Sequence, residues 1–386
     1  MGLTVLIAGG GTGGHLYPGI AVARELLARV PDAQVTFVGT AGGVEARVVP
    51  HEGFALDVIR SAGLKGKSFQ SLVRGMALLP VGAGDAWRVI TRRRPAVVVG
   101  VGGYSSGLVV LLAALRGIPT LLMEQNAMLG ITNRLLAPVV DAAAVTYQES
   151  ARFFGGKAFV SGNPVRPEFF DSGGLTASGH QDKGAQGHDI GIPSRTARGG
   201  DPAVRPPGAA RVLVFGGSQG AHAINVAMVE AAARLAAATP RVAITHQTGE
   251  RDLEMVRGGY RRAGLEARVE PFLFAMDREM KTADLVVCRA GATTLAELAA
   301  SGKASILVPL PTASDDHQRL NALAVVTHGA ARMVEQRELS GDRLAAELLA
   351  LAGDEAQRRR MGEAARQMAR PDAAKVIVDK VLALAR

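Results

Sequence analysis

Near the amino terminus the chain reads Gly9-Gly10-Gly11-Thr12-Gly13-Gly14-His15, directly after an apolar run at residues 4–8. A short apolar run followed by glycines is typical of a buried strand that turns into a helix. The first backbone N–H groups of such a helix lack partners within the helix, and the helix dipole favours negative charge there. The stretch therefore predicts a cradle for phosphate groups at the end of the first strand.

A second glycine-rich loop has the same arrangement in the second half of the chain. It reads Gly216-Gly217-Ser218-Gln219-Gly220-Ala221 and follows the apolar residues 212–215. One such loop alone would be weak evidence, but two of them about 200 residues apart predict two α/β domains that face each other across phosphate-bearing ligands. The length of 386 residues also favours two domains over one.

Strands and helices are expected to alternate along both halves of the chain. The expected strands are residues 4–8, 35–39, 54–59, 96–101, 120–124, 143–147 and 158–162 in the first half, and residues 212–215, 242–247, 267–270, 285–288, 305–309 and 332–334 in the second. This alternation indicates parallel sheets with helices on both faces, so each half is predicted to be a Rossmann-like, doubly wound α/β domain.

The composition divides the chain into four regions. Residues 1–166 and 211–363 are expected to be the two Rossmann-like domains, and residues 364–386 a C-terminal helical segment within a stretch that reads as helical from Leu344 to Arg386. Residues 171–210 are rich in glycine and proline and contain no aromatic residue. Because such a segment cannot bury enough surface to offset the entropy of ordering, we expect a flexible insertion there.

Charge and composition narrow the classes of partner. The formal charge of +9 favours phosphorylated substrates or an anionic membrane surface. Aromatic residues make up only 4% of the chain, and the sequence lacks zinc-finger spacings and RNA-binding aromatic signatures, so nucleic acid is not an expected partner. The single cysteine, Cys288, excludes an internal disulfide and fits a reducing, cytosolic location. The longest apolar stretches are shorter than the roughly 20 residues that cross a bilayer, so any membrane contact is expected to be peripheral.

The first loop also fits the dinucleotide pattern G-x-G-x-x-G at Gly9, Gly11 and Gly14. That pattern requires an acidic residue at the end of the second strand, which here ends Val38-Gly39-Thr40, so a dehydrogenase is not expected. His15 lies at the start of the predicted helix, where the dipole disfavours a protonated imidazole. A neutral histidine there can accept a proton from a hydroxyl, and the alternative is a histidine that only hydrogen-bonds the backbone.

Three further motifs follow predicted strands of the first half. The glycines of Gly100–Gly107 could place backbone amides at a helix start for a second phosphate, or could form a tight turn without a ligand. The polar residues Glu124-Gln125-Asn126 end an apolar strand, where side chains point into the crevice of an open α/β sheet. Arg166 could bind a phosphate bidentately, and the alternative is a surface arginine in a linker.

The second half offers two candidate segments. In Cys288-Arg289-Ala290-Gly291-Ala292-Thr293-Thr294-Leu295-Ala296-Glu297, the threonines and backbone amides can bind an anion. Glu297, about one turn later, can accept hydrogen bonds from two ribose hydroxyls or can simply face the helix dipole. The residues Asp315-Asp316-His317 resemble metal ligands, but neighbours on a helix do not share a face, so no metal site is expected. Gln318 and Asn321 are three residues apart and can bind one polar ligand.

The stretch from Lys65 to Arg94 interleaves basic residues with leucines, Val73, Met76 and Trp87. Apolar side chains at an interface together with cations for lipid headgroups would give peripheral binding to an anionic membrane surface. A partly mobile connection with a solvated run of charge is the alternative.

Taken together, these motifs resemble glycosyltransferase family 28, and in particular its members of peptidoglycan synthesis. The motifs that occur in the family's order are Gly10–His15, Gly102-Gly103-Tyr104, Glu124-Gln125-Asn126, Gly162-Asn163-Pro164-Val165-Arg166, Gly216–Ala221 and Cys288–Thr293. The resemblance implies a GT-B fold, in which two Rossmann-like domains face a cleft, and an inverting transferase with no cofactor and no essential metal. The implied reaction moves GlcNAc from UDP-GlcNAc to the 4-hydroxyl of MurNAc in undecaprenyl-pyrophosphoryl-MurNAc-pentapeptide (lipid I), giving lipid II and UDP. The implied location is the cytoplasmic face of the inner membrane, with other cell-wall synthesis proteins as candidate partners.

The resemblance also implies roles for single residues. His15 is the leading candidate base. The implied donor-binding residues are Thr12, Gly13, Gly14, Asn126 and Arg166 from the first half, Ser218, Gln219, Ala292, Thr293 and Thr294 near the phosphates, Leu273 at the uracil, Glu297 at the ribose and Gln318 at the GlcNAc hydroxyls. The implied acceptor-diphosphate residues are Gly13, Gly14, Gly102, Gly103 and Tyr104. The chain departs from the family at His317, where a second glutamine is common.

Other interpretations remain open at this point. One is a different GT-B enzyme, such as a glycolipid transferase or a UDP-sugar epimerase. An epimerase would need neither an acceptor nor a membrane-binding surface. Another is a nucleotide-sugar sensor without turnover.

Overall fold

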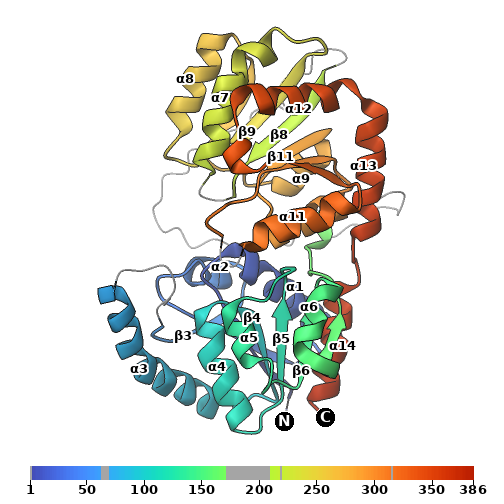
Figure 1. Ribbon diagram of the computed structural model, residues 1–386. Helices are drawn as coiled ribbons and strands as arrows, with labels where there is room; N and C mark the ends of the chain where they lie inside the picture. The colour runs from blue at the N-terminus through green and yellow to red at the C-terminus, as the bar shows by residue number, and fades with distance from the viewer. Residues whose placement is uncertain (1, 62–68, 171–208, 218–219, 314–315) are drawn as a thin grey trace, which may run out of the picture.

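The protein is described by a computed structural model that covers residues 2–61, 69–170, 209–217, 220–313 and 316–386. Within these ranges the chain forms two α/β domains, which lie one above the other in Figure 1, and each is built on one sheet. The predicted insertion at residues 171–210 falls almost entirely outside the described residues and stays a prediction.

The N-terminal domain contains a seven-stranded parallel sheet in the order β3-β2-β1-β4-β5-β6-β7. The strands are β1 (Thr4–Gly9), β2 (Gln34–Gly39), β3 (Ala55–Val58), β4 (Val97–Gly102), β5 (Thr120–Glu124), β6 (Ala142–Val145) and β7 (Ala158–Val160). The helices are α1 (Gly13–Arg29), α2 (Glu45–His51), α3 (Phe69–Arg93), α4 (Tyr104–Leu115), α5 (Ile131–Leu136) and α6 (Gln148–Ala151), followed by the 3-10 helices η1 (Arg152–Lys157) and η2 (Pro167–Phe169).

The C-terminal domain repeats this architecture with six parallel strands in the order β10-β9-β8-β11-β12-β13. The strands are β8 (Ala210–Phe215), β9 (Val242–Gln247), β10 (Ala267–Glu270), β11 (Leu285–Cys288), β12 (Ser305–Leu307) and β13 (Ala331–Met333). Its helices are α7 (His222–Ala236), α8 (Leu253–Ala263), α9 (Met276–Thr282), α10 (Ala292–Ser301), α11 (His317–Thr327), α12 (Gly341–Gly353) and α13 (Glu355–Met368), with the short 3-10 helix η4 (Gln336–Glu338). The last helix of the chain, α14 (Ala373–Leu384), packs on the N-terminal domain.

The strand order decides where a ligand can bind. In each sheet the chain builds outward on one side and then returns to the centre, so β1 lies beside β4 and β8 lies beside β11. The loops after such neighbouring strands leave in opposite directions and open a crevice at the carboxyl edge. The first glycine-rich loop follows β1 and the second follows β8, so both predicted loops lie at these crevices. The prediction of two doubly wound parallel sheets is confirmed.

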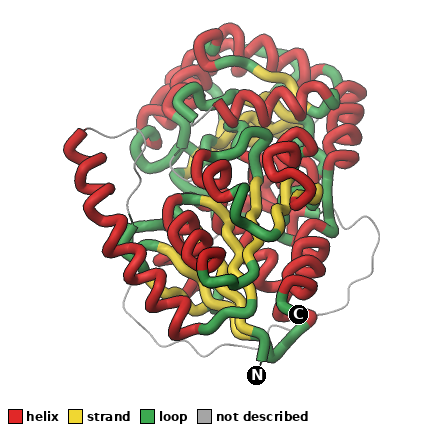
Figure 2. Tube along the Cα trace, turned by 60° about the horizontal axis from the view of Figure 1, so that its bottom comes forward, coloured by secondary structure: helices red, strands yellow, loops and turns green. Residues whose placement is uncertain are grey.

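Alternating side chains of each central strand supply the cores on the two faces of the sheet. Val5 and Ile7 of β1 pack beneath α1, and Leu6 and Ala8 pack in the separate core on the opposite face. This alternation is the geometry of a strand buried on both sides. Figure 2 shows the strands inside each domain and the helices around them.

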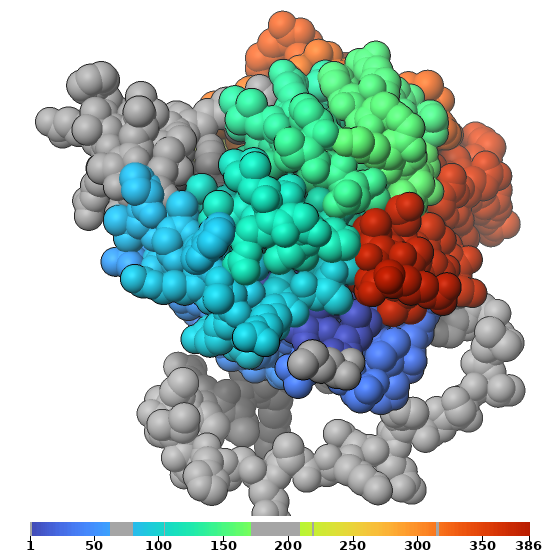
Figure 3. All heavy atoms as spheres, turned by 90° about the horizontal axis from the view of Figure 1, so that it is seen from below, coloured from blue at the N-terminus to red at the C-terminus, as the bar shows by residue number. Residues whose placement is uncertain are grey.

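The end of the chain is helical, but not throughout as predicted. Asp354 separates α12 from α13, and residues 369–372, which include Pro371, separate α13 from α14. The second break carries the chain back to the N-terminal domain, where Ile377, Val378 and Val381 are buried in the same core as Val5. In Figure 3 this last helix, in red, lies on the surface of the N-terminal domain.

The chain therefore crosses between the domains twice, and the two crossings touch. Phe169, just after the first crossing, is fully buried in the core of the C-terminal domain. Gly162 in the first crossing has φ +79°, and a Cβ built on it would lie 2.5 Å from the Cβ of Arg370 in the second. Only glycine tolerates both this backbone conformation and this contact.

Because α14 packs on the N-terminal domain, a substitution in this helix is expected to destabilise that domain, although the two are far apart in sequence. Ile377→Ala removes a fully buried side chain from the N-terminal core and is expected to lower the free energy of unfolding by about 2–5 kcal/mol. Val376→Ala on the same helix is the matched control, because Val376 is 38% exposed and should change stability by about 0.5 kcal/mol or less. Urea denaturation measures both variants, and equal effects would contradict the docking of α14.

Candidate active site

A cleft of about 1360 Å³ lies between the two domains and is lined by residues of both. The predicted site residues that line it are Thr12, Gly13, Gly14, His15, Gly102, Gly103, Asn126, Arg166, Leu273, Ala292, Thr293, Thr294, Glu297 and Gln318. Tyr104 is the first residue of α4. The predicted donor residues Ser218 and Gln219 lie outside the described residues.

The two glycine-rich segments of the N-terminal domain pack directly against each other. A Cβ on Gly103 would lie 2.7 Å from the carbonyl oxygen of Gly10, and a Cβ on Gly102 would lie 2.9 Å from Cδ2 of His15. Both positions also have positive φ, at +107° for Gly102 and +85° for Gly103. Side chains at these positions would separate the two segments, so the glycines allow one continuous floor beneath His15.

His15 is held in a form that can accept a proton. It lies in the first turn of α1, with Nδ1 3.4 Å from Oγ1 of Thr12. Burial lowers the pKa of His15; the hydrogen bond with the backbone of Gly10 opposes this shift, and the electrostatic effect of His317 adds to it. A lowered pKa favours the neutral imidazole; the helix dipole predicts a neutral His15 from the sequence, whereas in the structure the main cause of the shift is burial.

Glu45, at the start of α2, fixes the first glycine-rich loop, and sequence reasoning missed it. Its buried carboxylate accepts hydrogen bonds from the backbone N–H of Gly11 at 2.8 Å and of Thr40 at 2.9 Å. One N–H of the predicted phosphate cradle is therefore already bonded to the protein. The acidic residue expected at the end of the second strand is absent, but a carboxylate five residues later reaches back to that point.

Glu124 organises the loop that follows β5. One carboxylate oxygen accepts from the backbone N–H and the side-chain amide of Asn126, and the other accepts from Gly130 N–H and the amide of Asn133. Burial raises the pKa of Glu124, and these four N–H donors act against that shift. With all of its acceptor positions facing donors, Glu124 holds the loop in place and is not a free base.

The Glu124 loop reaches across the cleft to Asn321 of α11. The amide oxygen of Asn321 accepts from Ala127 N–H at 2.8 Å, and its Nδ2 lies 3.1 Å from Oδ1 of Asn126. Asn321 is fully buried by this contact. The described structure is therefore a conformation in which the two domains are in direct contact.

A second contact between the domains arises from a proline. Pro18 of α1 has no N–H, so the carbonyl of Gly14, four residues earlier, lacks its helical donor. The hydroxyl of Thr293 on α10 donates to this carbonyl at 2.9 Å. The hydroxyl that was predicted to bind phosphate is thus bonded to the opposite domain.

Arg166 and Glu297 face each other across the cleft. Nη2 of Arg166 is 4.0 Å from Oε1 of Glu297, and the guanidinium lies 5.1 Å from the ring centre of Tyr17. Burial raises the pKa of Glu297 to about 7, an effect that Arg166 only partly opposes. Because the side chain of Arg166 lines the cleft beside Glu297, it is not an arginine on the outer surface of a linker.

Two glutamines tie the loops of the C-terminal domain to one another. The side chain of Gln247 donates to the carbonyl of Gly217 at 2.9 Å and accepts from Leu273 N–H at 2.8 Å. Gln318 accepts from Leu310 N–H at 3.0 Å, and its side chain lines the cleft. Within the described ranges, no three His, Cys, Asp or Glu side chains are grouped so that they could hold a metal ion.

Two facing Rossmann-like domains with glycine-rich loops at both crevices define the GT-B class of glycosyltransferase. The sequence profile of the glycosyltransferase family 28 N-terminal domain matches residues 5–145, and that of the glycosyltransferase family 28 C-terminal domain matches residues 211–377. The chain therefore belongs to glycosyltransferase family 28.

Two relatives, both at least 43% identical, carry the name UDP-N-acetylglucosamine--N-acetylmuramyl-(pentapeptide) pyrophosphoryl-undecaprenol N-acetylglucosamine transferase. The relative from Pelobacter propionicus is 50% identical over 98% of this chain and 99% of its own length. The relative from Geobacter sulfurreducens is 43% identical over 100% of this chain and 99% of its own length. Among solved structures, MurG of Acinetobacter baumannii matches 99% of each chain with a TM-score of 0.74 and 28% identity. UDP-GlcNAc 2-epimerase from Neisseria meningitidis matches with a TM-score of 0.64 at 12% identity, which shows the shared fold alone.

The buried carboxyl of Glu297 predicts a pH-dependent effect on stability. In the folded protein it keeps its proton up to about pH 7, whereas in the unfolded chain it loses the proton near the ordinary value of 4.5. The folded state therefore binds more protons between these values, and stability falls as the pH rises through this window. Glu297→Gln is expected to raise the free energy of unfolding at pH 8 more than at pH 5, as measured by urea denaturation. An equal change at both pH values would show that the carboxyl is already ionised at pH 5.

Proposed function

We propose that this protein transfers GlcNAc from UDP-GlcNAc to the 4-hydroxyl of MurNAc in undecaprenyl-pyrophosphoryl-MurNAc-pentapeptide, releasing UDP. The observation that carries the proposal is full-length similarity to relatives named for this reaction. In addition, His15, whose pKa is lowered by burial, and both glycine-rich loops line the same cleft. The proposal makes the protein an enzyme of peptidoglycan synthesis that needs no cofactor.

The C-terminal domain is the proposed donor side. Leu273, held by Gln247, lines the uracil pocket, and Glu297 accepts hydrogen bonds from the ribose hydroxyls. Backbone amides at the start of α10 and of α7 face the diphosphate, and the side-chain amide of Gln318 meets the sugar. From the opposite domain, Arg166 and Asn126 complete the donor site.

The N-terminal domain is the proposed acceptor side. The floor formed by Gly13, Gly14, Gly102 and Gly103 receives the acceptor diphosphate close to His15. The acceptor oxygen attacks the anomeric carbon from the face opposite UDP, and the bond from that carbon to the UDP oxygen breaks with its electron pair going to UDP. His15 takes the hydroxyl proton, which its neutral imidazole can do at pH 7.

Stabilisation of the leaving group falls to the protein's own groups. Negative charge grows on the β-phosphate as the bond breaks, and N–H donors and cations fixed in a water-poor cleft stabilise that charge. Contacts such as Thr293 to Gly14 close the cleft and limit hydrolysis of the donor by water.

The lipid-linked acceptor places the protein at a membrane surface, and we propose the cytoplasmic face of the inner membrane. None of the helices in the described ranges is long and apolar enough to cross a bilayer. In the stretch from Lys65 to Arg94, residues 65–68 lie outside the described residues and α3 covers residues 69–93. Trp87 of α3 is 49% exposed, and Leu115 of neighbouring α4 is 72% exposed. Other cell-wall synthesis proteins remain proposed partners.

Several cations of this stretch are already bonded within the protein. Arg93 donates two hydrogen bonds to Asp57, at 2.8 and 3.0 Å, and Arg92 lies 2.7 Å from the same carboxylate. Burial acts to raise the pKa of Asp57, but these two arginines outweigh it and hold the pKa below its usual range. Reversing these charges would therefore disturb the fold, so the apolar residues give the cleaner test.

The reaction itself is tested by acceptor-dependent release of UDP. Incubation with UDP-GlcNAc and a lipid I analogue is expected to release UDP, and omission of the analogue should stop it. Release that does not need the analogue would support hydrolysis or epimerase chemistry, and binding without release would support a sensor.

The role of His15 is tested by His15→Ala. Loss of a general base is expected to lower kcat by roughly 10²–10⁴-fold, because proton transfer contributes about that factor. The Kd for UDP should stay near the wild-type value, because His15 lies on the acceptor side. Full turnover by the variant would eliminate His15 as the base.

Membrane docking is tested with the double variant Trp87→Ser and Leu115→Ser. Sedimentation with phosphatidylglycerol vesicles is expected to recover less of this variant, because it removes the exposed apolar side chains that would insert between lipids. Val376→Ser on α14, also exposed, is the matched control. Unchanged recovery of the double variant would remove this surface from the proposal.

A further inference from the structure

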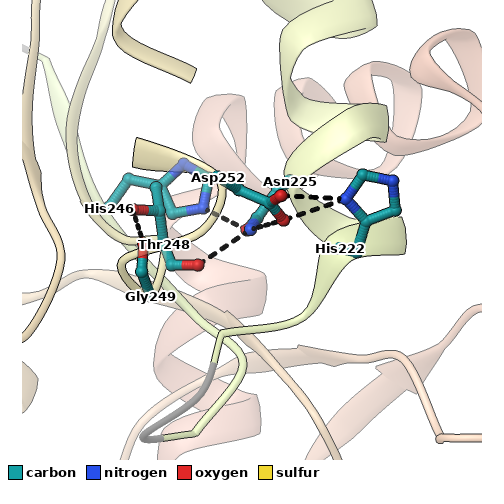
Figure 4. Close-up of polar contacts among 6 residues, drawn as sticks. All are labelled: His222, Asn225, His246, Thr248, Gly249 and Asp252. Atoms are coloured by element: carbon teal, nitrogen blue, oxygen red, sulfur yellow. Dashed lines mark hydrogen bonds and ion pairs between the residues drawn. The ribbon is translucent and has the colours of Figure 1, made fainter. Parts of the chain in front are cut away.

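His222 is a cleft residue to which nothing above gives a role. It is the first residue of α7, directly after the second glycine-rich loop, and its side chain is 58% exposed where it lines the cleft. Its Nδ1 lies 2.9 and 3.1 Å from the two carboxylate oxygens of Asp252. In Figure 4 Nδ1 of the ring faces this carboxylate, and the second ring nitrogen, Nε2, lies on the side of the ring away from it.

The carboxylate of Asp252 accepts a hydrogen bond from His222 and does not cap its own helix. It occupies the N-cap position of α8, where an aspartate ordinarily accepts a hydrogen bond from the first turn of its own helix. The carboxylate makes no such bond and instead accepts from His222 and, at 2.8 Å, from Nδ2 of Asn225. Burial acts to raise the pKa of Asp252, but these bonds outweigh it and keep the pKa below the usual range.

A chain of buried polar groups fixes Asp252 and Asn225 from the core outward. Nδ2 of Asn225 also donates to the carbonyl of Thr248, so its Oδ1 must accept from Nε2 of His246, 3.0 Å away. Nδ1 of His246 then accepts from the hydroxyl of Tyr260 at 2.7 Å. Burial lowers the pKa of His246 to about 3, which fits this neutral tautomer. The exposed imidazole therefore stands on a rigid, fully bonded support (Figure 4).

The other strong cations of the cleft have partners already. Among the described lining residues, the arginines are Arg166 and Arg289. Arg289 donates to the carbonyls of Val308 and Pro309 and to Gln336, and Arg166 faces Glu297. Nε2 of His222 has no hydrogen-bond partner among the described residues, and an imidazolium beside an ionised carboxylate is an N–H donor suited to an anion.

We infer that His222, oriented by Asp252, donates a hydrogen bond from Nε2 to the diphosphate of the bound nucleotide sugar, which the ring can do together with its bond to Asp252 when both ring nitrogens carry a proton. The inference rests on the proposed donor. It assigns a further contact residue to the reaction and makes Asp252 its positioning residue. Because the contact is to phosphate, its loss should lower the affinity for UDP and leave the affinity for the nucleoside uridine unchanged.

Calorimetric titration with UDP and with uridine tests the contact directly. His222→Ala is expected to raise the Kd for UDP by roughly tenfold or more, which is the factor for losing one hydrogen bond to a charged group. The Kd for uridine should not change. His222→Arg keeps a cation at this position and is expected to recover much of the UDP affinity. His328→Ala is the matched control, because His328 is exposed on the same domain and is not among the residues that line the cleft.

Asp252→Asn tests the positioning role. It keeps an oxygen that can accept a hydrogen bond from the imidazole but removes the negative charge. The Kd for UDP should therefore rise, by a smaller factor than in the His222 variant. Thermal unfolding of the variant shows whether its fold is retained, and kcat/KM for UDP-GlcNAc should fall in parallel with UDP affinity.

The outcomes separate the inference from the proposed function. Wild-type protein that binds no UDP would overturn both. Wild-type binding together with unchanged UDP affinity in His222→Ala would overturn the inference alone. Equal weakening of UDP and uridine would show that His222 only supports the loop.

Discussion

Hydrogen bonds from N–H groups to buried carboxylates hold the walls of the cleft, and the rest of the site depends on them. Glu45 fixes the first glycine-rich loop and Glu124 fixes the loop after β5. Asp252 does the same through side chains beside the second loop. Glycine-rich loops lose much entropy when they are ordered, so each needs an interaction strong enough to select one conformation. A carboxylate that accepts several N–H donors supplies it without filling the cleft.

Contacts between the domains then follow from groups that the fold leaves without partners. The carbonyl of Gly14 is free because Pro18 cannot donate, and Thr293 of the other domain uses it. Asn321 likewise meets the backbone of the Glu124 loop. A substrate that fills the cleft would compete with these contacts or add to them, so binding and domain closure share the same residues.

The sequence predicted the architecture well because its signals are local. Every expected strand is present, and the glycine-rich loops identify the crevices, since apolar runs and glycines act over a few residues. The supporting carboxylates were not predicted because Glu45 and Gly11 are 34 residues apart, and Asp252 and His222 are 30 apart. No spacing rule connects such pairs. The helical end was only partly predicted, because the turn at Pro371 and the docking of α14 depend on the tertiary fold.

The contact of Gly162 with Arg370 limits how the two halves can move. The two chain crossings between the domains lie side by side, so they act as one hinge. Opening is then a rotation about this hinge, largest at the far rim of the cleft and smallest beside the connections. A long lipid-linked substrate would enter from the rim, and cutting one connection alone would leave the halves joined through the other.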